Sequence, residues 1–399
     1  MGAAPATLGP VLAGARAFSA SAPGRAQTAA MWAVRVAAVE QAAPSAVVAD
    51  EGDTVRLGEL SPGCVACKAG QWDCIFVTMR CNLSCAFCLG PHFAADAPPH
   101  SALGDEPAVL AERYPRAGVT GASFSGGEPF LEPEMVVAWT RELRTAVPGL
   151  YLWAYTNGAL VTTALLERLA DAGLDELRFN VAATGYADEH VELMLAEAAE
   201  RLSAVTVEVP AIPADRESIL GSLGRWAERG VRYLNLHELV YEDGTNSGTL
   251  PGERAPVVMP DGHRCETDPR SEAVALEVIE RVAAEGLPLG VNDCSLRNKA
   301  RQLRGRRRML APFTLERHEQ LRDDGCAECA VLYPESGGPA AIAPDTPAEF
   351  ASLSEWERRL AVKPPGWRAA RAVRLLPLDL DGTGEWVAFE PLEREVAAR

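Results

Sequence analysis

Residues 81–88 read Cys81-Asn82-Leu83-Ser84-Cys85-Ala86-Phe87-Cys88 and follow an apolar run at residues 75–79. Three thiols this close in sequence are typical of a metal site. Thiolates spaced by three and then two residues can converge on one iron–sulfur cube, and because a cube has four irons, one iron is left without a protein ligand. The segment therefore predicts a cluster with an open iron at the end of a strand. A zinc site and unrelated buried thiols are the alternatives.

Composition limits the class of protein. The chain has 399 residues, 48% of them apolar, but no uninterrupted apolar run is long enough to cross a bilayer. A net charge of −17 argues against non-specific attraction to nucleic acid or to an anionic membrane, so a small or locally recognised substrate is expected. The ten cysteines do not resemble a secreted disulfide framework in a chain of this length. They predict a reducing cytoplasm and iron–sulfur ligation.

Four segments differ in pattern. Residues 1–30 are rich in Ala, Gly and Ser and contain no acidic residue, which imitates a transit peptide but also fits a start placed too early, with Met31 as the true start. They are excluded from the fold as disordered or mis-assigned. We expect a small β cap at 31–63 with a first strand at 32–39, a core at 64–310, and a C-terminal extension at 311–399 that ends in a β-hairpin.

The core alternates strand and helix patterns, which is typical of a parallel sheet with right-handed crossovers. Six βα units predict an α/β fold, a partial (β/α)6 TIM-like barrel with its site at the C-terminal strand ends. The strands are expected at 75–79, 121–125, 150–155, 176–181, 205–209 and 233–236, with a seventh at 287–291. A long polar loop at 241–269 is expected to be functional or mobile.

Two motifs together carry a family resemblance. The three-cysteine loop, with Phe87 before its last Cys, resembles the CxxxCxxC signature of the radical S-adenosylmethionine (SAM) superfamily, and Ser125-Gly126-Gly127-Glu128 resembles its GGE motif. The resemblance implies that Cys81, Cys85 and Cys88 hold a [4Fe-4S] cluster whose open iron SAM chelates. It further implies reductive cleavage of SAM to a 5′-deoxyadenosyl radical. Glycines let backbone approach a ligand, here the amino group of SAM by analogy.

The same analogy extends the SAM pocket to three further strand ends. Thr156 and Asn157 would meet the carboxylate or ribose of SAM, Arg178 and Asn180 would contact ribose or carboxylate, and Pro210 and Ile212 would hold the adenine. Arg178 alternates with apolar neighbours, so a structural ion pair is the alternative for it.

A narrower resemblance covers roughly residues 60–310. The pair Cys64-x-x-Cys67 and the segment Asn292-Asp293-Cys294-Ser295 look like a largely uncharacterised group related to pyruvate formate-lyase activating enzymes. Cys64, Cys67 and Cys294 make a plausible ligand set for an auxiliary iron–sulfur cluster, with Cys74 as a possible further ligand. Spacing equally allows Cys64, Cys67, Cys326 and Cys329 to bind zinc, or the thiols to be free. The role of Cys265 is open.

Substrate residues are expected in two places. Residues 297–308 form a basic block in which Lys299, Arg304 and Arg307 could capture an anionic substrate, unless the block is a solvated helix face. At the end of the sixth strand, Asn235 could bind substrate, and His237 and Glu238 could move a proton. His237 could instead be a core histidine.

Together these features predict a biosynthetic radical SAM enzyme that abstracts hydrogen from a small, anionic substrate. An auxiliary cluster could assist sulfur insertion or oxidation, and the reductant would be a protein such as flavodoxin or ferredoxin. The alternatives are a peptide-modifying or glycyl-radical-activating enzyme and a non-catalytic iron–sulfur sensor, for which the chain offers no DNA-reading module.

Overall fold

The computed structural model describes residues 37, 39–41, 43–50, 54–89, 98–242, 246, 248, 250–258, 264–334, 349–351, 367–376 and 385–391. The chain divides into two compact units: the larger holds residues 29–306, and the smaller includes residues 307–399. Each unit is described by itself. Within the described residues, no helix has both the length and the apolar character that a membrane span requires.

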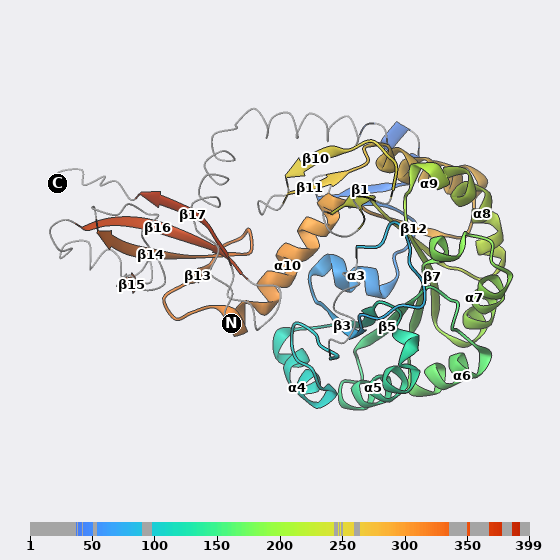
Figure 1. Ribbon diagram of the computed structural model, residues 1–399, viewed down its shortest axis with the longest axis horizontal. Helices are drawn as coiled ribbons and strands as arrows, with labels where there is room; N and C mark the ends of the chain where they lie inside the picture. The colour runs from blue at the N-terminus through green and yellow to red at the C-terminus, as the bar shows by residue number, and fades with distance from the viewer. Residues whose placement is uncertain are drawn as a thin grey trace. The chain divides into compact units, whose positions relative to one another are not determined.

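The larger unit is built on a nine-stranded sheet in the order β1-β2-β12-β8-β7-β6-β5-β4-β3 (Figure 1). Seven neighbouring strands in it are parallel. They are β3 (Trp72–Thr78), β4 (Gly121–Gly126), β5 (Tyr151–Thr156), β6 (Glu176–Phe179), β7 (Ala204–Pro210), β8 (Tyr233–His237) and β12 (Gly290–Cys294). The predicted α/β fold is therefore confirmed, and the seven parallel strands correspond to the six predicted βα units and the predicted seventh strand. The last strand begins three residues later than expected, so Cys294 is its final residue.

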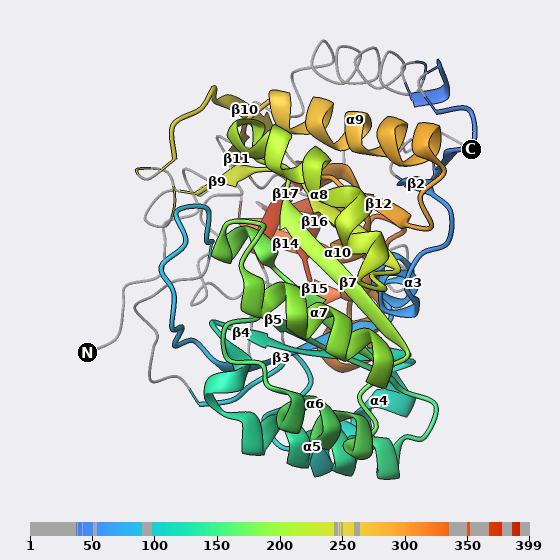
Figure 2. The ribbon, with the colours of Figure 1, turned by 90° about the vertical axis from the view of Figure 1, so that its right-hand side faces the viewer.

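Six helices surround these strands in an arc (Figures 1 and 2). They are α4 (Pro107–Ala117), α5 (Pro133–Ala146), α6 (Thr163–Ala172), α7 (Glu189–Arg201), α8 (Arg216–Glu228) and α9 (Arg270–Glu285). Each places an apolar stripe against the sheet: in α6, Leu165, Leu166 and Leu169 recur at helical spacing and are buried. This layer of aliphatic side chains forms the core and holds the strand ends in place.

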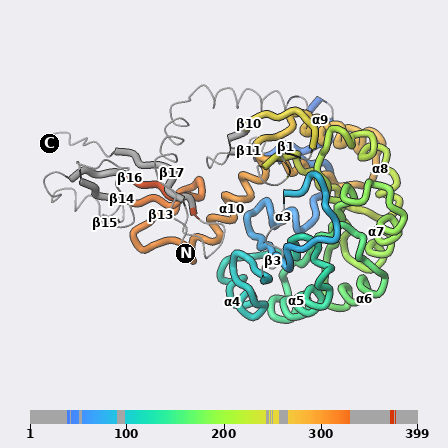
Figure 3. The backbone as a smooth tube through the Cα atoms, in the orientation of Figure 1, coloured from blue at the N-terminus to red at the C-terminus, as the bar shows by residue number. Residues whose placement is uncertain are grey.

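Helix α3 (Pro62–Ala69) lies inside the arc instead of outside it (Figures 1 and 3). Ser61 caps it by accepting a hydrogen bond from Cys64 N at 3.1 Å, and Pro62 occupies its first turn. Gly63 allows the close approach, because a Cβ there would stand 2.4 Å from Nη2 of Arg178. The docking of this helix carries Cys64 and Cys67 into the interior.

The N-terminal region differs from the expected separate β cap. Residues 39–41 are helical, which fits the helix-forming run Ala-Ala-Val-Glu-Gln-Ala at 37–42, and residues 32–36 lie outside the described residues. Strands β1 (Val47–Ala49) and β2 (Thr54–Leu57) do form an antiparallel pair. However, β2 also pairs with β12, so the hairpin extends the main sheet at its edge.

The polar segment at 241–269 contains structure that its composition did not predict. Strands β9 (Val240–Tyr241), β11 (Arg264–Thr267) and β10 (Ala255–Val258) form a small antiparallel sheet. Tyr241 and Thr267 bury their side chains, so the segment contributes to the packed structure.

The smaller unit is an antiparallel sheet. It comprises β13 (Gln320–Leu321), β14 (Cys326–Pro334), β15 (Glu349–Ala351), β16 (Trp367–Leu375) and β17 (Glu385–Pro391). The predicted terminal hairpin is present as the pair β16–β17, and its expected turn at 381–384 lies outside the described residues. The domain boundaries expected from the sequence remain predictions.

Candidate functional site

The three-cysteine loop follows β3 directly. Cys81, Cys85 and Cys88 are half-buried. Burial and, to a lesser extent, the neighbouring thiols of Cys81 and Cys88 raise the pKa of Cys85 to about 11. Leu83 N donates to Cys81 Sγ at 3.4 Å, and Asn157 Nδ2 donates to the same sulfur at 3.8 Å. Hydrogen bonds from N–H groups to a cysteine sulfur are a feature that tunes iron–sulfur clusters in proteins.

Gly126, the last residue of β4, and Gly127 after it hold this loop in place. Gly127 N donates to Thr78 O at 2.7 Å, and the next backbone N–H, of Glu128, donates to Arg80 O at 2.8 Å. A Cβ on Gly127 would stand 2.0 Å from Arg80 O, and one on Gly126 2.1 Å from Thr78 O. The glycines are therefore required by the chain just before Cys81. The sequence suggested only approach to SAM, which stays a prediction.

Glu128 is fully buried and engaged within the protein. Its carboxylate accepts hydrogen bonds from Phe130 N at 3.1 Å, Thr156 Oγ1 at 3.0 Å and Asn157 N at 2.8 Å. Burial raises the pKa of Glu128, and these hydrogen bonds oppose the rise. The carboxylate thus joins the ends of β4 and β5, and Asn157 Nδ2 carries the connection on to Asn82 Oδ1 at 2.7 Å. The contacts with SAM predicted for Glu128 and Thr156 must compete with these bonds.

Two other predicted SAM contacts lie along the same rim. Asn180 donates its backbone N–H to Thr156 O at 2.8 Å, while its side-chain oxygen is buried without a hydrogen-bond partner. Ile212 lines a hollow of about 410 Å³ with Pro213 and Ala214, and the half-buried Pro210 precedes it at the end of β7. The hollow is also lined by the charged residues Glu253, Asp268 and Arg270, and the contacts with SAM stay predictions.

Sequence reasoning missed Asn246, which holds the other end of the cysteine loop. Its side chain is 1% exposed and donates from Nδ2 to Phe87 O at 3.1 Å and to Val240 O at 2.8 Å. Phe87 also packs against the apolar cluster that contains Ile212 and Tyr241. No local signal marks Asn246, because it stands in a segment that reads as a polar loop.

Arg178 forms a buried ion-pair network, which was the alternative to its predicted SAM contact. Its guanidinium donates to Glu176 Oε1 at 2.8 Å, Glu208 Oε2 at 2.9 Å and Ser61 Oγ at 3.0 Å, and the side chain is 1% exposed. It also lies over the ring of Trp153, 4.9 Å from the ring centre. These bonds engage all three guanidinium nitrogens, so the prediction for Arg178 is corrected. Residues 176 and 178 lie on the same face of a strand, so alternation along the sequence brings Glu176 next to Arg178. The pairing of Arg178 with Glu208 could not be predicted in this way.

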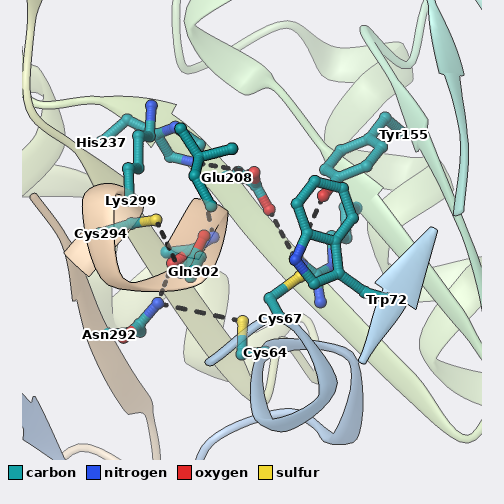
Figure 4. A pocket seen from close by; sticks show the side chains of 13 residues that line it. Cys64, Cys67, Trp72, Tyr155, Glu208, His237, Asn292, Cys294, Lys299 and Gln302 are labelled. Carbon is teal, nitrogen blue, oxygen red and sulfur yellow. Dashed lines mark hydrogen bonds and ion pairs between the residues drawn. The ribbon is translucent and has the colours of Figure 1, made fainter. Parts of the chain in front are cut away.

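An interior cavity of about 210 Å³ lies where α3 faces the sheet (Figure 4). It brings together the three thiols expected to form an auxiliary site with several of the predicted substrate residues. It is lined by Cys64, Cys67, Trp72, Tyr155, Arg178, Glu208, Asn235, His237, Asn292, Cys294, Lys299, Gln302 and Leu303. The cavity is smaller than the 300–1,000 Å³ of typical small-molecule pockets.

The cavity thiols are buried beside cations and amides. Burial raises the pKa of Cys64 and Cys67, and raises that of Cys294 to about 11 against the opposing charges of Lys299 and Lys68. The Nζ of Lys68 is buried without a hydrogen-bond partner. Amide donors also face two of the sulfurs: Asn292 Nδ2 lies 4.0 Å from Cys64 Sγ and Gln302 Nε2 lies 3.8 Å from Cys294 Sγ (Figure 4).

The two predicted proton carriers have different surroundings. His237 lines the cavity, with Nε2 2.6 Å from Glu208 Oε1. Although burial raises the pKa of Glu208, the charges of His237 and Arg178 and its hydrogen bonds lower it to about 2. Glu238 instead accepts a hydrogen bond at 2.9 Å from the backbone N–H of Leu296. Leu296 is the first residue of α10 (Leu296–Thr314). The catalytic role of Glu238 stays a prediction, and proton transfer there must compete with this hydrogen bond at the start of the helix.

The basic block is largely internal. Arg306 pairs with Asp73 at 3.0 Å and lies over Trp72, and Arg301 pairs with Asp50 at 2.9 Å. Within the smaller unit, Arg307 is 6% exposed and donates from Nε to Leu376 O at 3.1 Å. Of the three predicted substrate residues, Lys299 lines the cavity, and the substrate roles of Arg304 and Arg307 stay predictions.

The remaining cysteines are placed as follows. Cys74 on β3 is buried and is not among the residues that line the cavity; hydrogen bonds with Ser123 and Ser125 counter the rise that burial causes in its pKa. Cys326 and Cys329 lie three residues apart on β14, in regular register with β16. Side chains alternate along a strand, so these two thiols point to opposite faces and do not converge on one zinc. The side chain of Cys265 lies outside the described residues.

Within the described ranges, no three His, Cys, Asp or Glu side chains are arranged to hold a single metal ion. The assignments of Cys64, Cys67, Cys294 and Cys74 to an auxiliary site stay predictions.

Comparison with known proteins identifies relatives of this chain. Residues 75–205 match the model of the Radical SAM superfamily. The chain is 25% identical over 279 residues to a Methanocaldococcus jannaschii protein assigned to the glycyl-radical enzyme activating enzymes; the match spans 67% of this chain and 72% of that protein. It is 33% identical over 106 residues to the GTP 3′,8-cyclase of Lactiplantibacillus plantarum and over 107 residues to the PqqA peptide cyclase of Rhizobium meliloti. These two matches span 31% and 27% of the relatives' own lengths.

Solved structures resemble the chain more distantly. SuiB of Streptococcus suis bound to S-adenosylmethionine aligns with a TM-score of 0.40 and 15% identity, covering 55% of this chain and 49% of that one. The radical SAM methyltransferase TsrM of Kitasatospora setae aligns with a TM-score of 0.39 and 16% identity, covering 56% and 54%.

Proposed function

This chain belongs to the radical SAM superfamily and is an enzyme, and from that premise we propose that it cleaves SAM reductively at Cys81, Cys85 and Cys88 and abstracts hydrogen from a small, anionic substrate. The observation that carries the proposal is the loop itself: three half-buried thiols within eight residues, with two N–H groups directed at Cys81 Sγ. Gly127 and Asn157 hold this loop from the ends of β4 and β5.

These residues fit the cluster that the superfamily implies. When bound, a [4Fe-4S] cluster supplies the electron that cleaves SAM to a 5′-deoxyadenosyl radical. The protein contributes position: the amide of Asn157 stabilises thiolate charge at Cys81, and the unpartnered oxygen of Asn180 offers an acceptor nearby on the rim. The hollow at Ile212 offers apolar surface suited to adenine.

An auxiliary iron–sulfur cluster held by Cys64, Cys67 and Cys294 is the second part of the proposal. Three observations support it: the thiols line one cavity, amides of Asn292 and Gln302 face their sulfurs, and the Lys68 ammonium is buried without a partner. An anionic metal–thiolate group would neutralise that ammonium, which is otherwise costly to bury. The small cavity volume also suits an inorganic cluster better than a bulky organic ligand.

The proposal of an anionic substrate is supported by one residue of the cavity. Lys299 supplies a cation at the cavity, which suits an anionic substrate. Electron transfer from the substrate to a second cluster would serve an oxidation, and an open iron would serve sulfur insertion. A flavodoxin or ferredoxin as reductant and a cytoplasmic location complete the proposal.

The test compares two triple variants after anaerobic reconstitution. Cys81→Ala/Cys85→Ala/Cys88→Ala should keep about half of the iron and form no 5′-deoxyadenosine. Cys64→Ala/Cys67→Ala/Cys294→Ala should also keep about half of the iron but still cleave SAM. Cys74→Ala decides whether Cys74 is a further ligand: it removes a buried thiol outside the cavity lining, so we expect it to leave full iron. If the first variant cleaves SAM, the proposed catalytic loop is wrong; if it binds no iron, there is no second cluster.

A protein or peptide substrate is the second candidate. It is favoured by the match to the Methanocaldococcus jannaschii protein, which spans most of both chains. A peptide substrate and a small metabolite are separated by mass spectrometry of reaction mixtures, since only the former leaves a mass change on a polypeptide.

A further inference from the structure

Three thiols leave one iron of an auxiliary cube without a protein ligand. We propose that His237 supplies the fourth ligand through Nδ1, oriented by Glu208, so that the cavity is a Cys3His cluster site. This inference rests on the auxiliary cluster proposed above and concerns how that cluster is completed.

Strand register places His237 beside a cysteine of the set. In the parallel pair β8–β12, the partner of Cys294 is His237. Neighbouring strands lie about 4.8 Å apart, and paired residues point to the same face of the sheet. Both side chains line the cavity into which α3 brings Cys64 and Cys67 from the opposite side (Figure 4). The imidazole and the three thiols therefore line one small cavity.

The hydrogen bonding of the imidazole matches that of a metal ligand. Its Nε2 lies 2.6 Å from Glu208 Oε1, and Nδ1 makes no hydrogen bond to any residue that the structure describes. A histidine that binds metal through one ring nitrogen characteristically donates the other N–H to a carboxylate, which fixes the ring and its tautomer. Glu208 is itself held by Arg178 at 2.9 Å. The chain thus presents a pre-oriented ring with one unengaged nitrogen.

The other cavity residues are poorer candidates. Asn235 and Asn292 hydrogen-bond to each other, Gln302 is directed at Cys294 Sγ and at Asn298, and Arg178 is saturated by its ion pairs. Among the described residues that line the cavity, His237 carries the one imidazole. Lys299 and Lys68, whose charges both act on Cys294, would balance the negative charge of three thiolates.

Pulsed electron paramagnetic resonance tests the assignment directly. The Cys81→Ala/Cys85→Ala/Cys88→Ala protein, reconstituted with iron and sulfide and chemically reduced, should show a nitrogen hyperfine coupling that changes when histidine is labelled with ¹⁵N. Adding His237→Ala should abolish that coupling. Adding His190→Ala should preserve it, because His190 lies on α7 and bonds to Val161 O at 2.9 Å.

A further variant keeps the test decisive if His237→Ala binds no iron. His237→Cys offers a thiolate at the same position and should restore the iron while the histidine coupling stays absent. The proposal is overturned by a cluster without histidine coupling in the triple variant, or by a coupling that survives His237→Ala. Absence of all iron from the triple variant is a different result, since it removes the auxiliary cluster of the proposed function and this inference with it.

Discussion

The two groups of three thiols are brought together in different ways. Cys81, Cys85 and Cys88 lie in one short loop and are half-buried. Cys64 and Cys67 stand one turn apart on α3, whereas Cys294 ends β12 far along the chain. The loop thiols are neighbours in any compact conformation of residues 81–88. The cavity thiols meet only when α3 is docked inside the sheet.

The supports of the two groups differ accordingly. Backbone hydrogen bonds from the Gly126–Gly127 turn hold the loop, while the docking of α3 depends on the buried charges of Glu176, Arg178 and Glu208. Arg178 also bonds to Ser61, the cap of α3. Disturbing one support should therefore impair one thiol group and leave the other in place.

The largest expected effect comes from Gly127→Ala. The added Cβ would start 2.0 Å from Arg80 O, so the turn and the chain before Cys81 must separate. A displacement of about 1 Å can cost on the order of 100-fold in rate, and we expect at least that loss in 5′-deoxyadenosine formation. Iron bound at the cavity should remain. Gly221→Ala is the control, because nothing lies within 4 Å of a Cβ there; equal loss in both variants would contradict the proposed contact.

Arg178→Met should act on the other group. It leaves Glu176 and Glu208 as buried carboxylates without their cation, and such a loss destabilises by about 3–5 kcal/mol. Urea unfolding measures this, and iron analysis should show greater loss from the cavity than from the loop. Arg306→Met is the matched control, since it breaks the buried pair with Asp73. Retention of cavity iron by Arg178→Met alone would argue against the role of this network in holding α3.

A dependence of stability on pH should mark the same network. The folded-state pKa of Glu208 is lowered from 4.5 to about 2, so its contribution is fully present above pH 4.5 and is lost as the pH falls toward 2. The contribution is on the order of 3 kcal/mol. The difference in unfolding free energy between metal-free parent and Glu208→Gln should therefore shrink from pH 5 to pH 2. A difference that stays constant with pH would rule out this titration.

The smallest effect is expected for Arg304→Gln. Arg304 does not line the cavity, so stability should stay within about 0.5 kcal/mol of the parent and substrate conversion should be unchanged. Lys299→Gln is the comparison, because it removes the cavity cation and should raise the Michaelis constant for an anionic substrate. The reverse order of effects, measured at several salt concentrations, would restore the substrate role first expected for Arg304.

The features that follow from local spacing were predictable. The cysteine loop and the Gly-Gly turn are contiguous motifs, and the alternation of apolar strands with amphipathic helices predicted the parallel sheet, because periodicity is a property of neighbouring residues. The matched family model spans residues 75–205, the part of the chain that holds both motifs. Even the shared location of Cys64, Cys67 and Cys294 was expected, although whether they bind metal stays a prediction.

The hydrogen-bond and ion-pair partners of individual side chains could not be predicted from the sequence. A charged residue on a buried strand face signals some partner, but register and helix docking choose which one, and so Arg178 meets Glu208 and Ser61 instead of a ligand. Glu238 became a helix cap for the same reason, since α10 begins beside it. Asn246 reached the cysteine loop only because its segment folds into a small sheet. Spacing along the chain specified the three-cysteine loop. The ion pairs and helix caps around it depend on which surfaces pack together, because a buried polar group must find its partner among the residues that the fold brings near it.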